Sequence, residues 1–505
     1  MSASREKKKR QEQYETGSLV RDAKKTSNGG LSKLASWLVG ILAIIIAVAF
    51  VCLMVFNSST FLNHVTAVRV GDTTFSAAQA GYYYWDSANT VANYYGDYFK
   101  YFVDTTKSFK SQNYSEDMTW ADYFMNTAET SMQQQQLLSD AAKAANFALT
   151  DEQMQNISAN LAALETSAKN NGYADATAYL KAVYGKAASV DTYRDYLTMQ
   201  ALASTYYTEQ LNSYSYTQDQ LDSYYAEHKN DFDTVSYRVL AVSSDENTAD
   251  PKAEAERIAE ASAHHEAVFL EEATKRNAPT EEEIANGAEE YDAESTTLCE
   301  DYSYSQTNSA CADWLFDEAR LEGETYVAEY NNGSATTYYV IYFLSRQARE
   351  EKLVNIRHIL VPVSDSSDEA AKAEAKAKAE QLLSDWQDGE ATEDSFAALA
   401  NENSTDTGSN TNGGLYENVY PGQMVDTFND WCFDASRQAG DTGIVETTYG
   451  YHVMYFSGYS TEYGSYQDYL VENTLRSNDY NAWFDAKAES YPISENGFGM
   501  LFVNR

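Results

Sequence analysis

The chain has 505 residues and a formal net charge of −40, and hydrophobic residues make up 43% of it. This length suggests about three domains of roughly 150 residues each. The charge is uneven, because residues 1–33 hold nine Lys/Arg against four Asp/Glu while the remainder is strongly acidic. An acidic body repels phosphate backbones, so the composition argues against nucleic acid as a partner.

One long apolar segment follows the basic start of the chain. Residues 34–56 carry no charged side chain, and the run is long enough to cross a hydrocarbon core of about 30 Å as a helix. It is longer than the apolar region of a cleaved signal peptide, which has about 7–15 residues. We therefore expect one N-terminal transmembrane helix, with residues 1–33 as a cytoplasmic basic tail and residues 57–505 outside the membrane.

The next segment, residues 63–232, is expected to form a helical domain. Val68 and Val70 suggest a short strand before a turn, and apolar residues then recur at helical spacing with no proline to interrupt them. A capping box is typical of a helix start: the side chain of a Ser or Thr accepts from the N–H of the third helical residue, and a Gln at that third position accepts in return. Such pairs stand at Ser76/Gln79, Thr150/Gln153 and Thr217/Gln220.

Two later segments are copies of one domain. VSYRVLAV at 235–242 resembles VNIRHILV at 354–361, and WLFDEARLEGET resembles WCFDASRQAGDT further along each copy. We place the copies at residues 233–347 and 352–458. The second copy suggests strand, long helix, short helix, loop, helix and terminal strand, which is typical of a small antiparallel sheet covered by helices. The predicted fold class is therefore α+β.

The cysteines and histidines give no sign of a metal or cofactor. No CxxC pair exists among the four cysteines, which argues against structural zinc and thioredoxin-like chemistry. The run His264-His265-Glu266 falls in a helix rich in Ala and Glu with no second cluster nearby. We expect no metal and no cofactor, and the sequence leaves open whether Cys299 and Cys311 form a disulfide.

The second copy resembles the parvulin family of peptidyl-prolyl isomerases over about 105 residues. The pieces that carry the resemblance occur in the family's order: RHILV, FAALA, STDTGSNTNGGL, GQMVDTF, AGDTG and TTYGYHV, between residues 357 and 453. The N-terminal segment, with residues 462–505 packed back onto it, resembles the chaperone domain of SurA-type and PrsA-type foldases.

The parvulin resemblance implies a set of site residues. His358 and His452 would lie on paired central strands and share a hydrogen-bond network, which Asp406 would orient and Thr447 would extend. The residues that match the family's proline pocket are Leu415, Met424 and Phe428. A histidine on a strand is usually an ordinary polar residue, but two of only six histidines fall on the two family positions.

The first copy departs from this pattern at its site. Val239 stands where His358 stands, and Tyr339 stands where His452 stands. We expect this copy to be catalytically silent and to act as a spacer or binding module. In the second copy, the loop PVSDSSDEA is acidic where phosphate-directed parvulins are basic, so phosphorylated targets are disfavoured.

These features predict a membrane-anchored, extracytoplasmic isomerase and chaperone that helps exported polypeptides with X–Pro bonds to fold. The alternative is a chaperone whose parvulin copies only bind and do not isomerise. A surface adhesin or scaffold has no tandem adhesive modules to support it. A protease is disfavoured because no GxSxG or HExxH motif is present.

Overall fold

The structure, a computed structural model, describes residues 31–244, 248–333, 335–365 and 367–503. The chain divides into two compact units, one comprising Met1–Ser213 with Asp479–Arg505 and the other comprising Tyr214–Asn478. The predicted cytoplasmic tail, residues 1–33, lies almost entirely outside the described residues.

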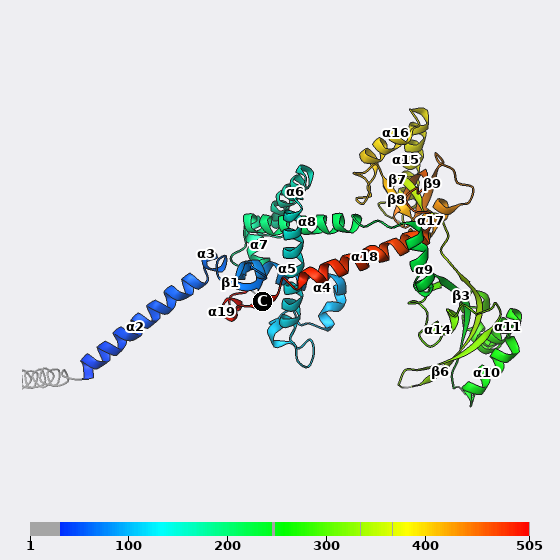
Figure 1. Cartoon of the computed structure of the whole chain (residues 1–505), viewed down its shortest axis with the longest axis horizontal. Coiled ribbons are helices and arrows are strands. Elements are labelled where there is room, and N and C mark those ends of the chain that lie inside the picture. Colours follow the sequence, from blue (N-terminus) through cyan, green and yellow to red (C-terminus); the bar gives the residue numbers. More distant parts are fainter. Residues whose placement is uncertain (1–30, 245–247, 334, 366, 504–505) are drawn as a thin grey trace, which may run out of the picture. The chain divides into compact units, whose positions relative to one another are not determined.

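Helices make up most of the first unit (Figure 1). Ser76 and Thr150 begin α4 and α6 with the predicted capping boxes, in which a hydroxyl accepts from the N–H of a Gln whose side chain accepts in return. The helical elements are α2 (Leu31–Phe56), α3 (Ser59–Leu62), α4 (Ala77–Tyr95), the 3₁₀ helices η1 (Gly96–Tyr101) and η2 (Phe109–Ser111), α5 (Trp120–Ala144), α6 (Asp151–Asn170), α7 (Ala176–Tyr184), α8 (Val190–Asn212) and α19 (Gly497–Met500).

The first unit also contains a small sheet, so the prediction of an all-helical domain is wrong. Strand β1 (Thr66–Val70) pairs antiparallel with β2 (Thr73–Ser76) on one side and with β11 (Ile493–Glu495) on the other. The expected short strand could not stand alone, because its unpaired N–H and C=O groups need partners. The C-terminal segment supplies them, as the predicted return of that segment to the N-terminal domain requires.

Helix α2 contains the whole predicted apolar run, residues 34–56. Most of its described large hydrophobic side chains are exposed, among them Ile45 at 57% and Phe50 at 63%. Within the residues available to that search, which are only those the structure describes, no helix has both the length and the hydropathy needed to cross a membrane.

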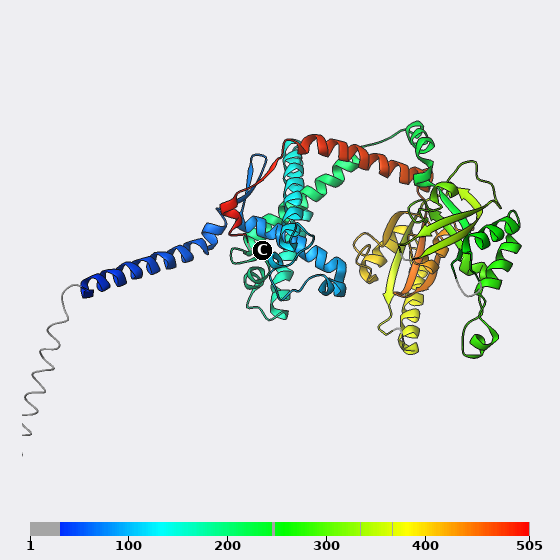
Figure 2. The ribbon, with the colours of Figure 1, turned by 90° about the horizontal axis from the view of Figure 1, so that it is seen from below.

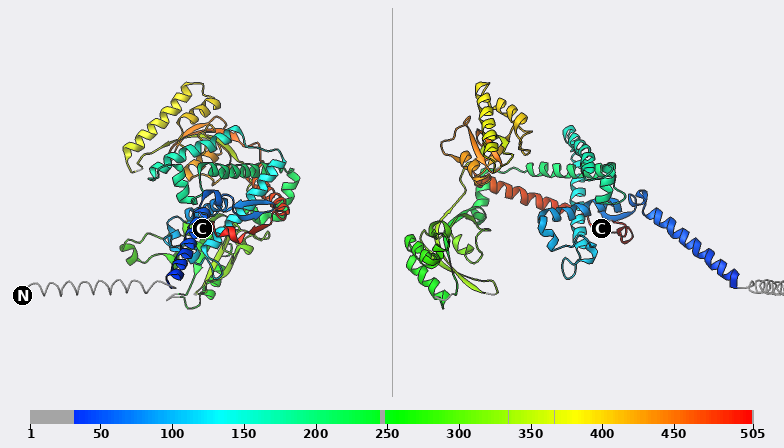
Figure 3. Two further views of the ribbon diagram at one scale, coloured as in Figure 1. Left: turned by 90° about the vertical axis from the view of Figure 1, so that its left-hand side faces the viewer. Right: turned by 180° about the vertical axis from the view of Figure 1, so that it is seen from behind.

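The second copy of the repeated domain forms a four-stranded antiparallel sheet in the order β8-β7-β10-β9. Side chains alternate between its faces. One face packs against α15 and α16, which Figure 3 shows beside the strands, and the other packs against α17. The elements are β7 (Val354–Pro362), α15 (Glu369–Asp388), α16 (Glu393–Asn403), β8 (Leu415–Val419), α17 (Asp426–Phe433), β9 (Thr442–Thr447) and β10 (Gly450–Tyr459).

The first copy has the same topology, with strand order β4-β3-β6-β5. Its central pairing even keeps the register, because Tyr339 pairs with Ala241 as His452 pairs with Leu360. The elements are β3 (Thr234–Val242), α10 (Pro251–Ser262), α11 (Glu266–Asn277), α12 (Glu281–Ala285), α13 (Ala293–Thr297), β4 (Leu298–Ser303), α14 (Ala312–Leu315), β5 (Thr325–Asn331) and β6 (Thr336–Gln347).

Two remaining segments belong to the second unit, whereas the sequence had grouped them with the helical domain. Helix α9 (Gln218–Phe232) and the first part of α18 (Tyr466–Ala488) share a cluster in which Val471 packs against Leu221 and Phe232. This burial joins α9 to α18, and residues 214–232 and 462–478 fall within the second compact unit. Cys299 and Cys311, which pack in one cluster of the first copy, are free thiols.

Candidate active site

The two predicted histidines lie together on the α17 face of the second sheet. His358 is on β7 and His452 is on β10, in antiparallel strands that pair directly. Their rings stack with centroids 5.2 Å apart and an interplanar angle of 19°. The side chains are almost fully buried, with residue exposures of 3% and 5%. Strand alternation explains why they share this face, since each lies an even number of residues from an apolar neighbour that packs on α17.

A continuous hydrogen-bond chain runs through the two imidazoles. His358 Nδ1 lies 2.9 Å from His452 Nδ1, and His358 Nε2 lies 2.9 Å from Asp406 Oδ2. At the other end, His452 Nε2 lies 2.8 Å from the hydroxyl oxygen of Thr447. The structure therefore brings together all four residues that the sequence assigned to this network.

The chemistry of the end groups fixes the direction of every bond in the chain. An ionised carboxylate only accepts, so His358 Nε2–H must donate to Asp406. A neutral His358 then accepts at Nδ1 from His452 Nδ1–H, which leaves His452 Nε2 to accept from the Thr447 hydroxyl. Thr447 in turn accepts from the Tyr449 N–H at 3.1 Å. One proton arrangement thus satisfies the whole chain with both imidazoles neutral.

Burial keeps the two imidazoles neutral. Removal from water lowers the pKa of His358, although Asp406 opposes the shift. Burial, together with the neighbouring His358, lowers the pKa of His452 to about 4. Both pKa values therefore lie below the ordinary histidine value of about 6.5. At neutral pH the pair carries no charge and serves to orient its neighbours.

Asp406 carries the negative charge of the site. It follows α16 in a loop, and its Oδ2 accepts from the Ser409 hydroxyl at 2.5 Å and from the Tyr416 hydroxyl at 3.0 Å. Burial raises the pKa of the Asp406 carboxyl, but hydrogen bonds from Ser409 and His358 outweigh it and lower the pKa to about 2. Its side chain is 20% exposed, so the carboxylate is accessible from the surface.

Ser409 and Tyr416 are site residues that the sequence did not single out. The Ser409 side chain also lies 3.2 Å from His358 Nε2, and the Tyr416 ring lies 5.4 Å from the His358 ring. Ser409 lies inside the quoted STDTGSNTNGGL segment, and Tyr416 follows it directly. That position in or beside a family motif narrows the candidates to one short segment, but it does not single out either residue.

The glycine pair of the same segment allows the loop to approach β7. Gly414 has a φ of +69°, and a Cβ built on it would lie 2.2 Å from the backbone oxygen of His358. The His358 N–H donates to the Gly414 carbonyl at 2.9 Å. Only glycine combines this left-handed conformation with so close an approach. The GGL motif therefore positions the loop that carries Asp406.

An aromatic wall closes the apolar side of the site. Phe428 of α17 meets the His358 and His452 rings edge-on, with centroids 5.5 and 5.2 Å away. Met424 packs in the same cluster as Phe428. Leu415, the third residue predicted for the proline pocket, is not in this cluster, whereas its neighbour Tyr416 is. Alternation along β8 explains the exchange, because adjacent residues point to opposite faces.

An open hollow of about 600 Å³ adjoins the hydrogen-bond chain at its Thr447 end. Val425 at the start of α17 and Gly450 at the start of β10 also line it. The hollow lies next to the α17 wall, so a peptide placed across the site has room to continue past Thr447.

The first copy has neither imidazole and is filled at the same place. Val239 and Tyr339 pack there with a buried cluster that includes Cys311 and Phe316. Each is in the strand position that a histidine occupies in the second copy. Where the second copy has a polar chain reaching the surface, the first copy has apolar packing.

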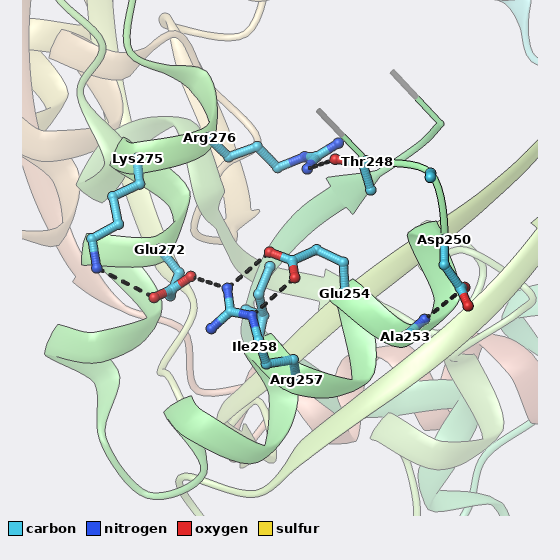
Figure 4. A pocket seen from close by; sticks show the side chains of 10 residues that line it. Thr248, Asp250, Ala253, Glu254, Arg257, Ile258, Glu272, Lys275 and Arg276 are labelled. Atoms are coloured by element: carbon cyan, nitrogen blue, oxygen red, sulfur yellow. Dashed lines mark hydrogen bonds and ion pairs between the residues drawn. The ribbon is translucent and has the colours of Figure 1, made fainter. Parts of the chain in front are cut away.

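A hollow of about 640 Å³ in the first copy, lined mainly by α10 and α11, does not resemble a catalytic site (Figure 4). Its charges satisfy one another, because Arg257 lies 2.8 Å from Glu254 and 2.5 Å from Glu272. Lys275 adds a third contact, 3.3 Å from Glu272. Across the described residues, no group of three or more His, Cys, Asp or Glu is arranged to hold a metal ion.

Comparison with known proteins finds a family match over this part of the chain. Residues 339–457 match the family described as the PPIC-type PPIASE domain. The matched range begins at β6 of the first copy and contains every member of the hydrogen-bond chain. The second copy is thus a parvulin domain of the PPIC type.

Similar proteins carry the name of a foldase. Over 116 residues the chain is 38% identical to foldase protein PrsA 1 of Listeria innocua, an alignment that covers 23% of this chain and 34% of that protein. Over 60 residues it is 45% identical to foldase protein PrsA 3 of Bacillus cereus, covering 12% of this chain and 20% of that one. The chain thus matches about a third or less of the length of these relatives.

Among solved structures, the chain is similar to PrsA from Bacillus subtilis, with 15% sequence identity and a TM-score of 0.24. That alignment covers 74% of this chain and 88% of the other.

Proposed function

We propose that the second copy catalyses cis/trans isomerisation of X–Pro bonds, and that the whole chain is a foldase that combines this activity with chaperoning. The observation that carries the proposal is the unbroken chain from Thr447 through His452 and His358 to an ionised Asp406, beside the Phe428 wall. The PPIC-type match and the foldase relatives support it.

The reaction needs no nucleophile. Rotation about an X–Pro bond is slow because amide resonance gives the C–N bond double-bond character, with a barrier of about 18–20 kcal/mol. A catalyst has only to favour the twisted amide over the planar one. Resonance places more negative charge on the oxygen of the planar amide, so a carboxylate near that oxygen disfavours the planar form. Asp406, held ionised by its hydrogen bonds, fits this role.

The surrounding groups suit the rest of a prolyl peptide. Met424 and Phe428, which is only 3% exposed, are proposed to lie against the proline ring. Tyr416 packs in the same apolar cluster, and the predicted Leu415 does not. The hydroxyls of Tyr416 and Thr447 are half-buried and lie at the two ends of the polar chain. The buried imidazoles act as positioning residues, since they hold Asp406 and Thr447 in place without reaching solvent.

The first copy is proposed to be catalytically silent and to serve as a spacer or binding module. Its α14 face holds Val239 and Tyr339 in place of the two histidines and is closed by apolar packing. No hydrogen-bond chain like that of the second copy is possible there. Valine has no hydrogen-bonding group in its side chain, and tyrosine has a single hydroxyl in place of the two ring nitrogens of histidine.

The substrates are proposed to be unfolded exported polypeptides without a phosphate before the proline. Asp365, Asp368 and Glu369 stand at the turn between β7 and α15. This concentration of negative charge opposes a phosphorylated residue near the site.

The protein is proposed to be held in the cell membrane by α2, with residues 57–505 outside. Two observations support this: residues 34–56 carry no charge, and the described large side chains of α2 are exposed apolar groups such as Ile45 and Phe50. Exposed apolar surface of this extent is unfavourable in water and favourable in lipid.

The test is an isomerisation assay on the full chain in detergent micelles, using a short unphosphorylated X–Pro peptide. We expect the wild type to accelerate isomerisation, and Asp406→Ala and His452→Ala to lose about 10- to 100-fold of that rate. A phosphoserine before the proline should reduce the acceleration.

The matched control is Asp430→Ala, which removes an exposed carboxylate of α17 that lies outside the hydrogen-bond chain. It should keep the wild-type rate. No acceleration by a folded wild type would contradict the isomerase proposal and favour a chaperone whose parvulin copies only bind.

A further inference from the structure

Four phenylalanine side chains, Phe56, Phe61, Phe498 and Phe502, gather where α2 ends. The Phe56 ring lies 5.1 Å from Phe61, 5.4 Å from Phe502 and 6.4 Å from Phe498, measured between centroids. Figures 1 and 2 show α19 beside α3 and the end of α2. The C-terminal tip of the chain therefore meets the helix where its apolar run stops.

The fold fixes this tip firmly against the first unit. The Asn496 N–H donates to the Ala67 carbonyl at 2.7 Å, and the Asn496 side chain accepts from the N–H groups of Phe498 and Gly499. A Cβ on Gly499 would lie 1.8 Å from the Thr66 oxygen, so α19 lies directly on β1. The position of the tip does not depend on its own apolar side chains alone.

The tip has two faces of different character. Met500 and Val503 are 4% exposed and belong to the core of the first unit. Phe498 and Leu501 are 54% and 74% exposed. A segment that needed only to close the core would present polar residues outward, whereas this one presents a large aromatic and a large aliphatic side chain.

The polar groups of the region mark the level at which the apolar run ends. Asn57 is the first polar residue after Phe56, and its side-chain oxygen accepts from Lys186 Nζ at 3.0 Å. A lysine at this level suits the headgroup region of a bilayer, where its charged end stays in water. Phe498 lies at the same end of α2, with its ring centroid 6.4 Å from that of Phe56, and Leu501 directly follows α19.

We propose that Phe498 and Leu501 insert into the interfacial region of the lipid bilayer and form a second membrane contact beside α2. This inference rests on the anchoring proposed above. Aromatic and aliphatic side chains on a short surface element are suited to the boundary between headgroups and acyl chains. With two contacts, the first unit is held to the outer membrane surface by α2 and by the segment around α19.

The experiment places a diazirine amino acid at one position at a time in the full chain, reconstituted in vesicles of phosphatidylcholine and phosphatidylglycerol. After irradiation, lipid adducts are counted by mass spectrometry. Leu501 is the test position. Ile45 in α2 reports on the anchor itself, and Leu321 of the first copy, 64% exposed, is the matched exposed leucine.

We expect lipid adducts at positions 501 and 45, and only background at position 321. Adducts at position 45 without adducts at position 501 would overturn the second contact and leave the anchor in place. Absence of adducts at both positions would overturn the anchor as well. Circular dichroism of each variant establishes that the chain is folded before irradiation.

Discussion

The two copies of the repeated domain share a scaffold and differ in what fills one face of it. In each copy an arginine of the first strand pairs with a glutamate that begins the second helix: Arg238 with Glu266 at 2.6 Å, and Arg357 with Glu393 at 2.9 Å. The central strands keep the same register in both. The parts that build the sheet are thus retained in both copies.

A second retained pair makes the same point. Arg320 lies over the Trp314 ring at 4.0 Å in the first copy, and Arg437 lies over the Trp431 ring at 4.0 Å in the second. Against this common background, one face holds a polar chain in the second copy and an apolar cluster in the first. The comparison teaches that this fold is stable without the residues of the site. Their presence in the second copy is therefore explained by the proposed catalysis and not by folding.

The largest structural effect is expected from Gly414→Ala. Gly414 is the residue of the site loop that lies directly against β7 in the second copy. Its new Cβ would lie 2.2 Å from the backbone oxygen of His358, and the alanine would have to keep the positive φ of the glycine. We expect a loss of about 3 kcal/mol in the local unfolding free energy of β7, from strain and overpacking together. Amide hydrogen exchange of β7, read by mass spectrometry, measures this loss.

Gly422→Ala is the control for that change. Gly422 also has a positive φ, of +81°, but nothing lies within 4 Å of its built Cβ. It should therefore lose only the conformational cost of about 1 kcal/mol. Equal losses in the two variants would mean that the site loop does not approach β7 as closely as described.

The next effect is the pH dependence that the two buried imidazoles of the second copy should contribute. The folded-state pKa values of His358 and His452 lie below the unfolded value of about 6.5. Stability is therefore fully present above pH 6.5 and is lost as the pH falls towards 4, because only the unfolded chain takes up these protons. The slope is at most about 1.4 kcal/mol per pH unit for each histidine.

Urea unfolding between pH 8 and pH 4.5 measures this slope, and a double variant isolates it. His358→Val with His452→Tyr gives the second copy the residues of the first and removes both imidazoles. The difference in unfolding free energy between this variant and the wild type should change with pH below 6.5. A difference that stays constant over the range would show that the imidazoles are not buried in their neutral form.

The smallest expected effect is none at all, from giving the first copy the two histidines. Val239→His with Tyr339→His, made in the double variant of the second copy, should restore no isomerase activity. The first copy lacks the Asp406 loop and its paired glycines, so two imidazoles there would have no carboxylate to orient. The peptide assay decides this, and recovered activity would mean that the histidine pair suffices.

Much of the second copy could be predicted from the sequence, because short motifs in a fixed order constrain one another. The repeat follows from the matching segments of the two copies, and the meeting of His358, Asp406, His452 and Thr447 is what the resemblance to the parvulin family implies. Ser409 could not be chosen in advance, since its segment holds several Ser, Thr and Asn with no periodicity. Tyr416 was hidden for another reason, because it is one of 41 tyrosines.

The first unit was harder to predict because its sheet depends on distant residues. Val68 pairs with Glu495 across almost the whole chain, and no local pattern specifies such a partner. A three-residue strand such as β11 is also too short for its alternation to be visible. Local signals did succeed where the physics is local, as the capping boxes at Ser76 and Thr150 demonstrate.

The most direct test of the account compares two double variants in the peptide isomerisation assay, using the full chain in detergent. The first variant carries His358→Val and His452→Tyr in the second copy. The second variant carries Val239→Ala and Tyr339→Phe in the first copy. The first copy establishes that this sheet accepts Val and Tyr at those positions, so circular dichroism should remain that of the wild type. We predict that the first variant loses the acceleration and that the second keeps it. Wild-type acceleration by the first variant, or its loss in the second, would contradict the assignment of catalysis to the second copy.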